Sequence, residues 1–97
     1  MSYFFHEGAR IEHLEYIAYY EAAQKGLGAR YLQSFEAAMR IVCAAPTRYK
    51  LEAPPNIRRF KLTTFPYSII FRDVDGVVEV LVIAPHRRQP EYWIERF

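Results

Sequence analysis

The sequence is poor in several features that would point to a secreted or membrane protein. Cys43 is the only cysteine, which excludes an intrachain disulfide and makes a cytoplasmic protein the expectation. No apolar run approaches the roughly 18 residues that a membrane-spanning helix needs, so we expect no membrane association. The N-terminal run Tyr3-Phe4-Phe5 is too short for a signal peptide and lacks a preceding basic segment.

Metal-binding and cofactor-binding patterns are also missing. The three histidines, His6, His13 and His86, show no ligand spacing with the cysteine or with carboxylates, so we predict no metal site and no cofactor. There is no internal repeat or low-complexity segment. The 97 residues, 52% of them hydrophobic, are enough for one core, so we expect a single domain over residues 1–97.

The net charge of +2 is small, but the charge is unevenly distributed along the chain. Residues 1–47 contain four Lys or Arg against five Asp or Glu, whereas residues 48–97 contain nine against six. The total is too low to imply a polyanionic partner by itself. Any surface that faces an anion is therefore expected in the C-terminal half.

The first half of the chain predicts a short aromatic strand over Ser2–His6 and a helical hairpin. The first helix begins at Ala9 and ends at Gly26-Leu27-Gly28, and the second ends before Pro46. The short connection makes the helices antiparallel. Apolar residues at steps of three and four predict these buried stripes: Ile11, Leu14, Ile17, Ala18 and Ala22, then Leu32, Phe35, Met39 and Val42. If Leu14 and Phe35 are buried, truncating either to alanine should cost roughly 2–5 kcal/mol.

The second half predicts a loop over Thr47–Asn56 and then three strands. Asp75-Gly76 is a strong hairpin signal between the last two strands. The strands are expected at Ile57–Thr63, Pro66–Asp73 and Val77–Ala84, with a short helix from Pro90. The last strand is apolar on both faces except at Glu79, which indicates a central position. The predicted class is α+β, in the order β-α-α-β-β-β, with a twisted, mainly antiparallel sheet covered on one face by the helical hairpin.

Basic residues are expected on the sheet face that the helices leave open. Arg59 and Lys61 alternate with apolar neighbours, and Arg72 should lie opposite to Phe71. Cleaving RNA without a metal requires deprotonation of the 2′-hydroxyl, stabilisation of the phosphorane charge and protonation of the leaving oxygen. The candidates for such catalysis are Arg59, Lys61, Arg72, His86, Arg87 and Tyr92. Alternatively, the strand cations are simply solvated, and Tyr92 and Trp93 only hold the terminal helix on the core.

Three segments in order resemble the RelE/ParE superfamily of bacterial toxins from type II toxin–antitoxin pairs. They are Ile57-Arg58-Arg59-Phe60, the run from Phe65 to Phe71, and the run from His86 to Trp93 with Arg96. The resemblance implies a toxin neutralised by a small antitoxin that is at least locally acidic and that makes any contact with operator DNA. The residues proposed for the antitoxin groove are Tyr16, Tyr19, Tyr20 and Tyr31, with the alternative that they edge the core.

The superfamily divides into ribosome-dependent mRNA endoribonucleases like RelE and DNA gyrase inhibitors like ParE. The ending Pro90-x-Tyr92-Trp93 is more similar to ParE and to plasmid-stabilisation proteins. The ParE-like interpretation is favoured because a lysine cluster and a clear carboxylate partner for His86 are missing, Glu52 being the one weak candidate. It implies that the target is bound by Arg87, Arg88, Tyr92, Trp93 and Arg96. The alternatives are a metal-independent ribonuclease, or a weakly toxic module that only binds the antitoxin and supports autoregulation.

Overall fold

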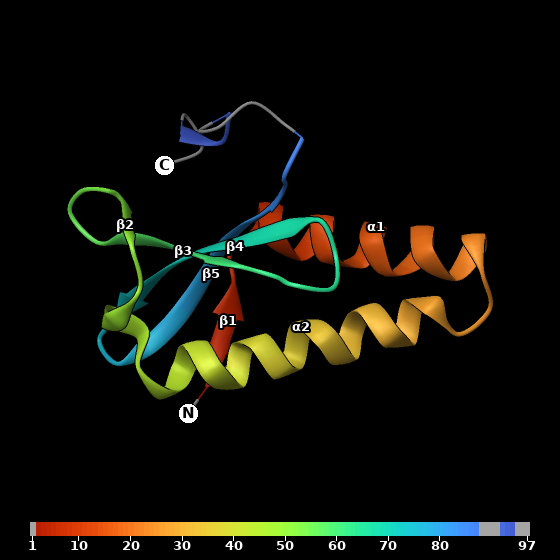
Figure 1. The fold of residues 1–97 in the computed structure, drawn as a ribbon. Coiled ribbons are helices and arrows are strands. Elements are labelled where there is room, and N and C mark those ends of the chain that lie inside the picture. Colours follow the sequence, from red (N-terminus) through yellow and green to blue (C-terminus); the bar gives the residue numbers. More distant parts are fainter. Residues whose placement is uncertain (1, 88–91, 95–97) are drawn as a thin grey trace.

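A helical hairpin packs on one face of a five-stranded sheet in the computed structural model (Figure 1). The structure describes residues 2–87 and 92–94. Its elements are β1 (Tyr3–Phe5), α1 (Glu7–Ala23), α2 (Leu27–Ala44), the 3-10 helix η1 (Pro46–Arg48), β2 (Leu51–Ala53), β3 (Ile57–Lys61), β4 (Tyr67–Val74) and β5 (Val77–Pro85). No helix in these residues is long and apolar enough to cross a membrane.

The sheet has the strand order β1-β5-β4-β3-β2. Strand β1 runs parallel to β5, and the other neighbouring pairs are antiparallel. Asp75 (φ 52°) and Gly76 (φ 87°) form the left-handed turn between β4 and β5, as a tight hairpin requires. The predicted α+β class and the order of its main elements are therefore confirmed, and β5 is an inner strand as its apolar sequence indicated.

Two parts of the predicted element map differ from the structure. The segment taken as a loop contains η1 and β2, and β2 pairs irregularly with β3 through Leu51↔Arg58 and Ala53↔Ile57. Three residues followed by two prolines carry too little periodicity to predict a strand. The helix predicted from Pro90 is not confirmed, because Arg88, Pro90 and Arg96 lie outside the described residues.

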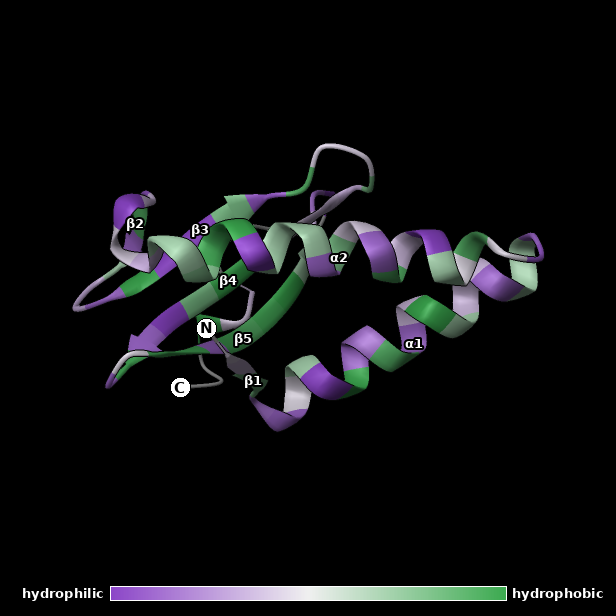
Figure 2. Cartoon of the chain, turned by 90° about the horizontal axis from the view of Figure 1, so that it is seen from below, coloured by the Kyte–Doolittle hydropathy of each residue, from purple (hydrophilic) through white to green (hydrophobic). Residues whose placement is uncertain are grey.

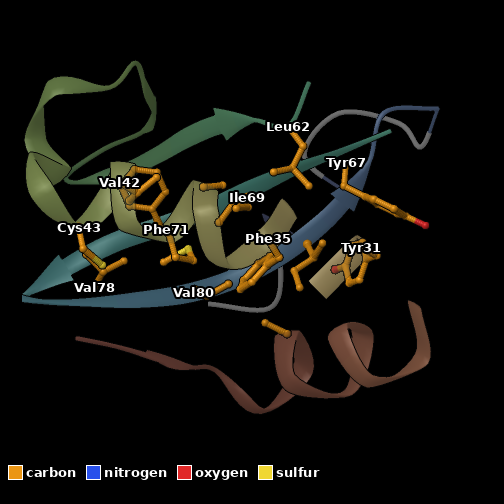
Figure 3. Close-up of a cluster of buried hydrophobic side chains, with 14 residues drawn as sticks. Tyr31, Phe35, Val42, Cys43, Leu62, Tyr67, Ile69, Phe71, Val78 and Val80 are labelled. Carbon is orange, nitrogen blue, oxygen red and sulfur yellow. The ribbon is translucent and has the colours of Figure 1, made fainter. Parts of the chain in front are cut away.

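The main core lies between α2 and the sheet (Figure 3). Phe35, Met39 and Val42 are fully buried, so most of the stripe predicted for the second helix is confirmed. Cys43 is buried beside them. The sheet contributes Leu62, Tyr67, Ile69, Phe71, Val78, Val80 and Ile83 to the same cluster.

The stripe predicted for the first helix is wrong except at Ile17, which does pack against the core. Ile11 and Leu14 are 45% and 53% exposed, and Ala18 and Ala22 are also exposed. The residues of α1 that face the core are instead Ala9, His13, Tyr16, Ile17 and Tyr20. Apolar residues occur around most of this helix, and green and purple segments alternate along it in Figure 2. The face with the larger rings is buried because tyrosine and histidine rings bury more area than alanine methyl groups.

The second face of the sheet carries an apolar cluster of its own and is not simply open. Trp93 is 3% exposed and packs there. The other buried members of this cluster are Ala53, Ile57, Ile70, Leu81, Val82 and Ala84. The described C-terminal residues therefore cover part of the face that the helices leave uncovered (Figure 1).

Candidate functional site

A cleft of about 800 Å³ lies between α1 and the ends of β4 and β5 where the C-terminal segment begins. The residues that line it are Glu12, Glu15, Tyr16, Tyr19, Tyr20, Pro66, Tyr67, Pro85, His86, Arg87 and Tyr92. Three tyrosines proposed for antitoxin binding thus meet three residues proposed for catalysis or target binding. The sequence analysis did not predict that these two groups lie at one cleft.

Side chains of α1 fix this helix against the edge of β5. The backbone of β1 follows β5 until the His6 N–H donates to the Val80 carbonyl at 2.8 Å. Beyond that point the Ile83 N–H donates to Glu12 Oε1 at 3.0 Å, and the Tyr16 hydroxyl donates to the Ile83 carbonyl at 3.1 Å. The backbone N–H and carbonyl of Ile83 lie beyond the part of β5 that pairs with β1, and side chains of α1 satisfy them.

The floor of the cleft is a packed group of tyrosine rings. Tyr16 stacks on Tyr67 with ring centroids 4.3 Å apart, and the Tyr20 hydroxyl donates to the Tyr67 hydroxyl at 3.2 Å. Burial raises the pKa of Tyr67 above its usual value, so its phenol stays neutral. Tyr19 lies at the rim and is 65% exposed. The cleft therefore offers a group of packed tyrosine rings and the exposed ring of Tyr19.

Tyr31 does not belong to this cleft. Its side chain is fully buried in the main core, and its hydroxyl lies 3.2 Å from His13 Nδ1. The structure thus places one of the four tyrosines proposed for antitoxin binding inside the main core. The alternative interpretation, that these tyrosines belong to the core, applies to Tyr31.

The cations predicted for the sheet face do lie opposite to the helices, but two of them are paired. Arg72 Nε donates to Glu79 Oε1 at 2.9 Å, and Arg59 Nε lies 3.6 Å from Glu52 Oε1. Glu52, considered as a partner for His86, therefore faces Arg59 instead. These carboxylates reduce the positive potential that a phosphate backbone would meet.

The predicted catalytic residues are consequently split between two places. His86, Arg87 and Tyr92 line the cleft, whereas Arg59, Lys61 and Arg72 do not. The His86 backbone N–H donates to the Pro66 carbonyl at 2.9 Å, while the His86 side chain is exposed. Trp93, proposed to bind the target, is instead buried against the sheet.

Sequence reasoning missed the acidic wall of the cleft, which Glu12 and Glu15 provide. A signal for it exists in the sequence: Glu12, Glu15, Tyr16 and Tyr19 follow each other at helical spacing on one face. The cleft is therefore bipolar: glutamates of α1 line it together with His86 and Arg87, which come directly after β5. Within the described residues, no group of three or more His, Cys, Asp or Glu side chains is placed to hold a metal ion.

The sequence matches a family described as the ParE toxin of the type II toxin–antitoxin system parDE, over residues 3–90. No curated protein matches the chain at the level of sequence. Among solved structures, the fold is similar to that of a chain in the chromosomal ParDE system from P. aeruginosa. That likeness has 17% identity and a TM-score of 0.72, and covers 88% of this chain and 95% of the other.

Two structures from E. coli share the fold as well. The intact RelBE toxin–antitoxin complex contains a chain with 20% identity and a TM-score of 0.66, covering 91% of this chain and 100% of that one. The isolated RelE toxin has 20% identity and a TM-score of 0.64, and the likeness covers 99% of this chain and 98% of the RelE chain. At these identities the likeness establishes the fold, while the match over residues 3–90 establishes the family.

Proposed function

The chain belongs to the ParE toxin family of type II toxin–antitoxin systems, and on this premise we propose that it arrests growth by inhibiting DNA gyrase. The contact with gyrase is centred on Arg87 and Tyr92 at the cleft. The cognate antitoxin neutralises the toxin by binding over the same cleft, through the exposed ring of Tyr19 and the edges of Tyr16 and Tyr20.

The observation that carries this proposal is the acidic wall of the cleft. An RNA backbone entering the cleft would meet the carboxylates of Glu12 and Glu15, which repel phosphate. The sheet face offers little compensation, because Arg59 and Arg72 are paired with Glu52 and Glu79. A protein target with charges of both signs suits a bipolar cleft better than a polyanion does.

A ribonuclease remains the second candidate because His86, Arg87 and Tyr92 line one cleft. In that case the His86 imidazole or the Tyr92 hydroxyl transfers protons, and the Arg87 guanidinium stabilises the phosphorane charge. The chain would then be a metal-independent enzyme that cuts mRNA on the ribosome.

The test combines two assays on the same purified protein. Gyrase supercoiling and gyrase-dependent DNA cleavage are measured beside cleavage of ribosome-bound mRNA, for the original chain and for Arg87→Ala and Lys61→Ala. We expect inhibition of supercoiling with intact mRNA. Arg87→Ala should weaken inhibition roughly tenfold, as for the loss of one anchoring interface residue. Lys61→Ala removes an exposed cation outside the cleft and should change inhibition less than twofold.

Other outcomes separate the alternatives. Cut mRNA with unaffected gyrase, abolished by His86→Ala, would establish the ribonuclease. Absence of both activities from folded protein, together with no growth arrest on expression, would identify a module that acts only with its antitoxin.

A further inference from the structure

Residues 40–61 form a strongly basic segment of the chain. They contain six Lys or Arg against a single acidic residue, Glu52, which already faces Arg59. The remaining residues contain seven Lys or Arg against ten Asp or Glu. The small net charge of the whole chain is thus the sum of a basic segment and an acidic remainder. A partner that binds at this segment meets the local charge and not the total.

Three of these cations lie together at the outer edge of the sheet. Arg48 ends η1, Lys50 directly precedes β2, and Arg58 pairs with Leu51 across β2 and β3. Arg58 Nη1 donates to the Tyr49 carbonyl at 2.8 Å, and the Arg48 guanidinium lies 6.0 Å from the centroid of the Tyr49 ring. We call the surface formed by Arg48, Lys50 and Arg58 the basic corner.

The backbone that carries the basic corner is held in place by the core. The Tyr49 ring packs edge-on against Phe60 and Phe71, at centroid distances of 5.4 and 6.1 Å. The Lys50 carbonyl accepts a hydrogen bond from the Arg59 N–H at 3.2 Å. A partner therefore meets cations on a packed segment, which lowers the entropy cost of ordering them on binding.

The cations of the basic corner are available to an anion. Arg48 and Lys50 are exposed and Arg58 is partly buried, and none of the three makes an ion pair with any of the described residues. Guanidinium groups donate pairs of N–H groups that match the oxygens of phosphate, and lysine adds a point charge. Closely spaced cations of this kind suit the regularly spaced phosphates of a nucleic acid, and phosphate contacts carry no base sequence information.

The basic corner is separate from the cleft. None of its residues lines the cleft, which lies at α1, the start of β4 and the end of β5. The corner lies instead at β2 and β3, beyond β4 in the strand order of the sheet (Figure 1). The glutamates that repel phosphate at the cleft therefore do not lie at the corner, and two partners can bind at the same time.

We propose that the basic corner binds the phosphodiester backbone of duplex DNA, without reading its sequence, while the cleft holds the protein target. The choice of DNA over RNA rests on the proposed function, because gyrase holds duplex DNA while it works. A toxin that contacts both the enzyme and its DNA binds the gyrase–DNA complex more tightly than gyrase alone, because the second contact is made at a high effective concentration.

The first test measures binding of the isolated chain to a fluorescent duplex of about 20 base pairs at about 50 mM salt. Three phosphate contacts predict that log K falls with log salt at a slope of about −2 to −3. Arg48→Gln combined with Lys50→Gln should weaken binding at least tenfold and reduce the slope by about 2. Lys25→Gln combined with Arg30→Gln is the control, because it removes the same two residue types from exposed positions at the hairpin tip. The control should change affinity less than threefold.

Three results of this test would overturn the proposal. They are absence of binding by the original chain at low salt, equal effects of the two double variants, and binding of poly-glutamate of the same charge as tightly as DNA. The last result would assign the corner to an acidic protein segment. Tighter binding of single-stranded RNA than of duplex DNA would overturn the choice of DNA. Thermal unfolding of each variant shows that the fold is retained.

The second test separates this inference from the proposed function. Inhibition of gyrase supercoiling is measured for the same variants, and we expect the change at Arg48 and Lys50 to weaken it at least threefold while binding to gyrase without DNA is unchanged. Inhibition of gyrase by a chain that does not bind DNA would reject the basic corner alone. Binding of DNA at the corner without any effect on gyrase would reject the proposed function alone.

Discussion

His13 shows how far a single residue can depart from its usual environment. The imidazole is 8% exposed and stacks with the ring of Phe5, at a centroid distance of 5.1 Å. The ring of Phe35 lies 4.4 Å away on a tilted plane, and the Tyr31 hydroxyl is at hydrogen-bond distance from Nδ1. Burial lowers the pKa of His13 from 6.5 to about 4. The native fold therefore holds a neutral imidazole within its aromatic core.

This burial predicts that stability falls at acidic pH. Between pH 6.5 and pH 4 the unfolded chain binds a proton at His13 that the folded chain does not. The free energy of unfolding should therefore decrease as the pH falls through this range. The loss should be roughly 2 kcal/mol once partial solvent screening is allowed for. Urea unfolding at a series of pH values measures it, and His13→Leu should flatten the curve in this range. An unchanged slope in that variant would show that other groups cause the acid sensitivity.

At the scale of elements, the hairpin is closed by a close contact between α1 and α2 at Gly28. A Cβ atom on Gly28 would lie 2.7 Å from the Ile17 carbonyl oxygen and 3.0 Å from Glu21 Cβ. Helix propensity alone predicts that Gly28→Ala stabilises α2, by less than the roughly 1 kcal/mol of a helix interior because Gly28 lies in the first turn. We expect instead a net loss of about 1–3 kcal/mol, because the helices must separate. Urea unfolding of the Gly28→Ala variant decides between a gain and a loss of stability. Increased stability would show that α1 and α2 can separate at this contact at little energetic cost.

The prediction of elements from sequence succeeded where local chemistry is decisive. The turn at Asp75-Gly76 and the bounds of β4 depend on adjacent residues and were predicted within one or two residues. The inward face of α1 was not predicted correctly. The exposed stripe with Ile11 and Leu14 has the same helical spacing as the stripe that is buried, so the spacing does not distinguish them. Which stripe faces the core depends on how rings such as Tyr16 pack against the sheet. Tertiary packing decides which face is buried, and helical periodicity alone does not predict it.

At the scale of the whole molecule, the cleft could not be assembled from sequence. Its residues come from α1, from the ends of β4 and β5 and from Tyr92, and they meet only because β5 lies between β1 and β4. The ion pairs of the sheet face also depend on strand register. Arg59 and Arg72 each alternate with apolar residues of their own strand, which predicted the side of the sheet on which they lie. The glutamates that neutralise them come from neighbouring strands, and the pattern of one strand does not reveal these partners.

The position of Trp93 in the whole fold changes the role expected for this residue. Because its indole is 3% exposed and packs with Ile70 and Val82, we expect it to stabilise the fold and not to touch a target. Trp93→Ala should lower the free energy of unfolding by about 3–5 kcal/mol, whereas Trp93→Phe should lose much less. Toxicity should follow stability, so that Trp93→Phe arrests growth as the original chain does. If Trp93→Phe is as stable as the original but harmless, the indole acts in target binding, and Trp93 must leave the sheet to do so.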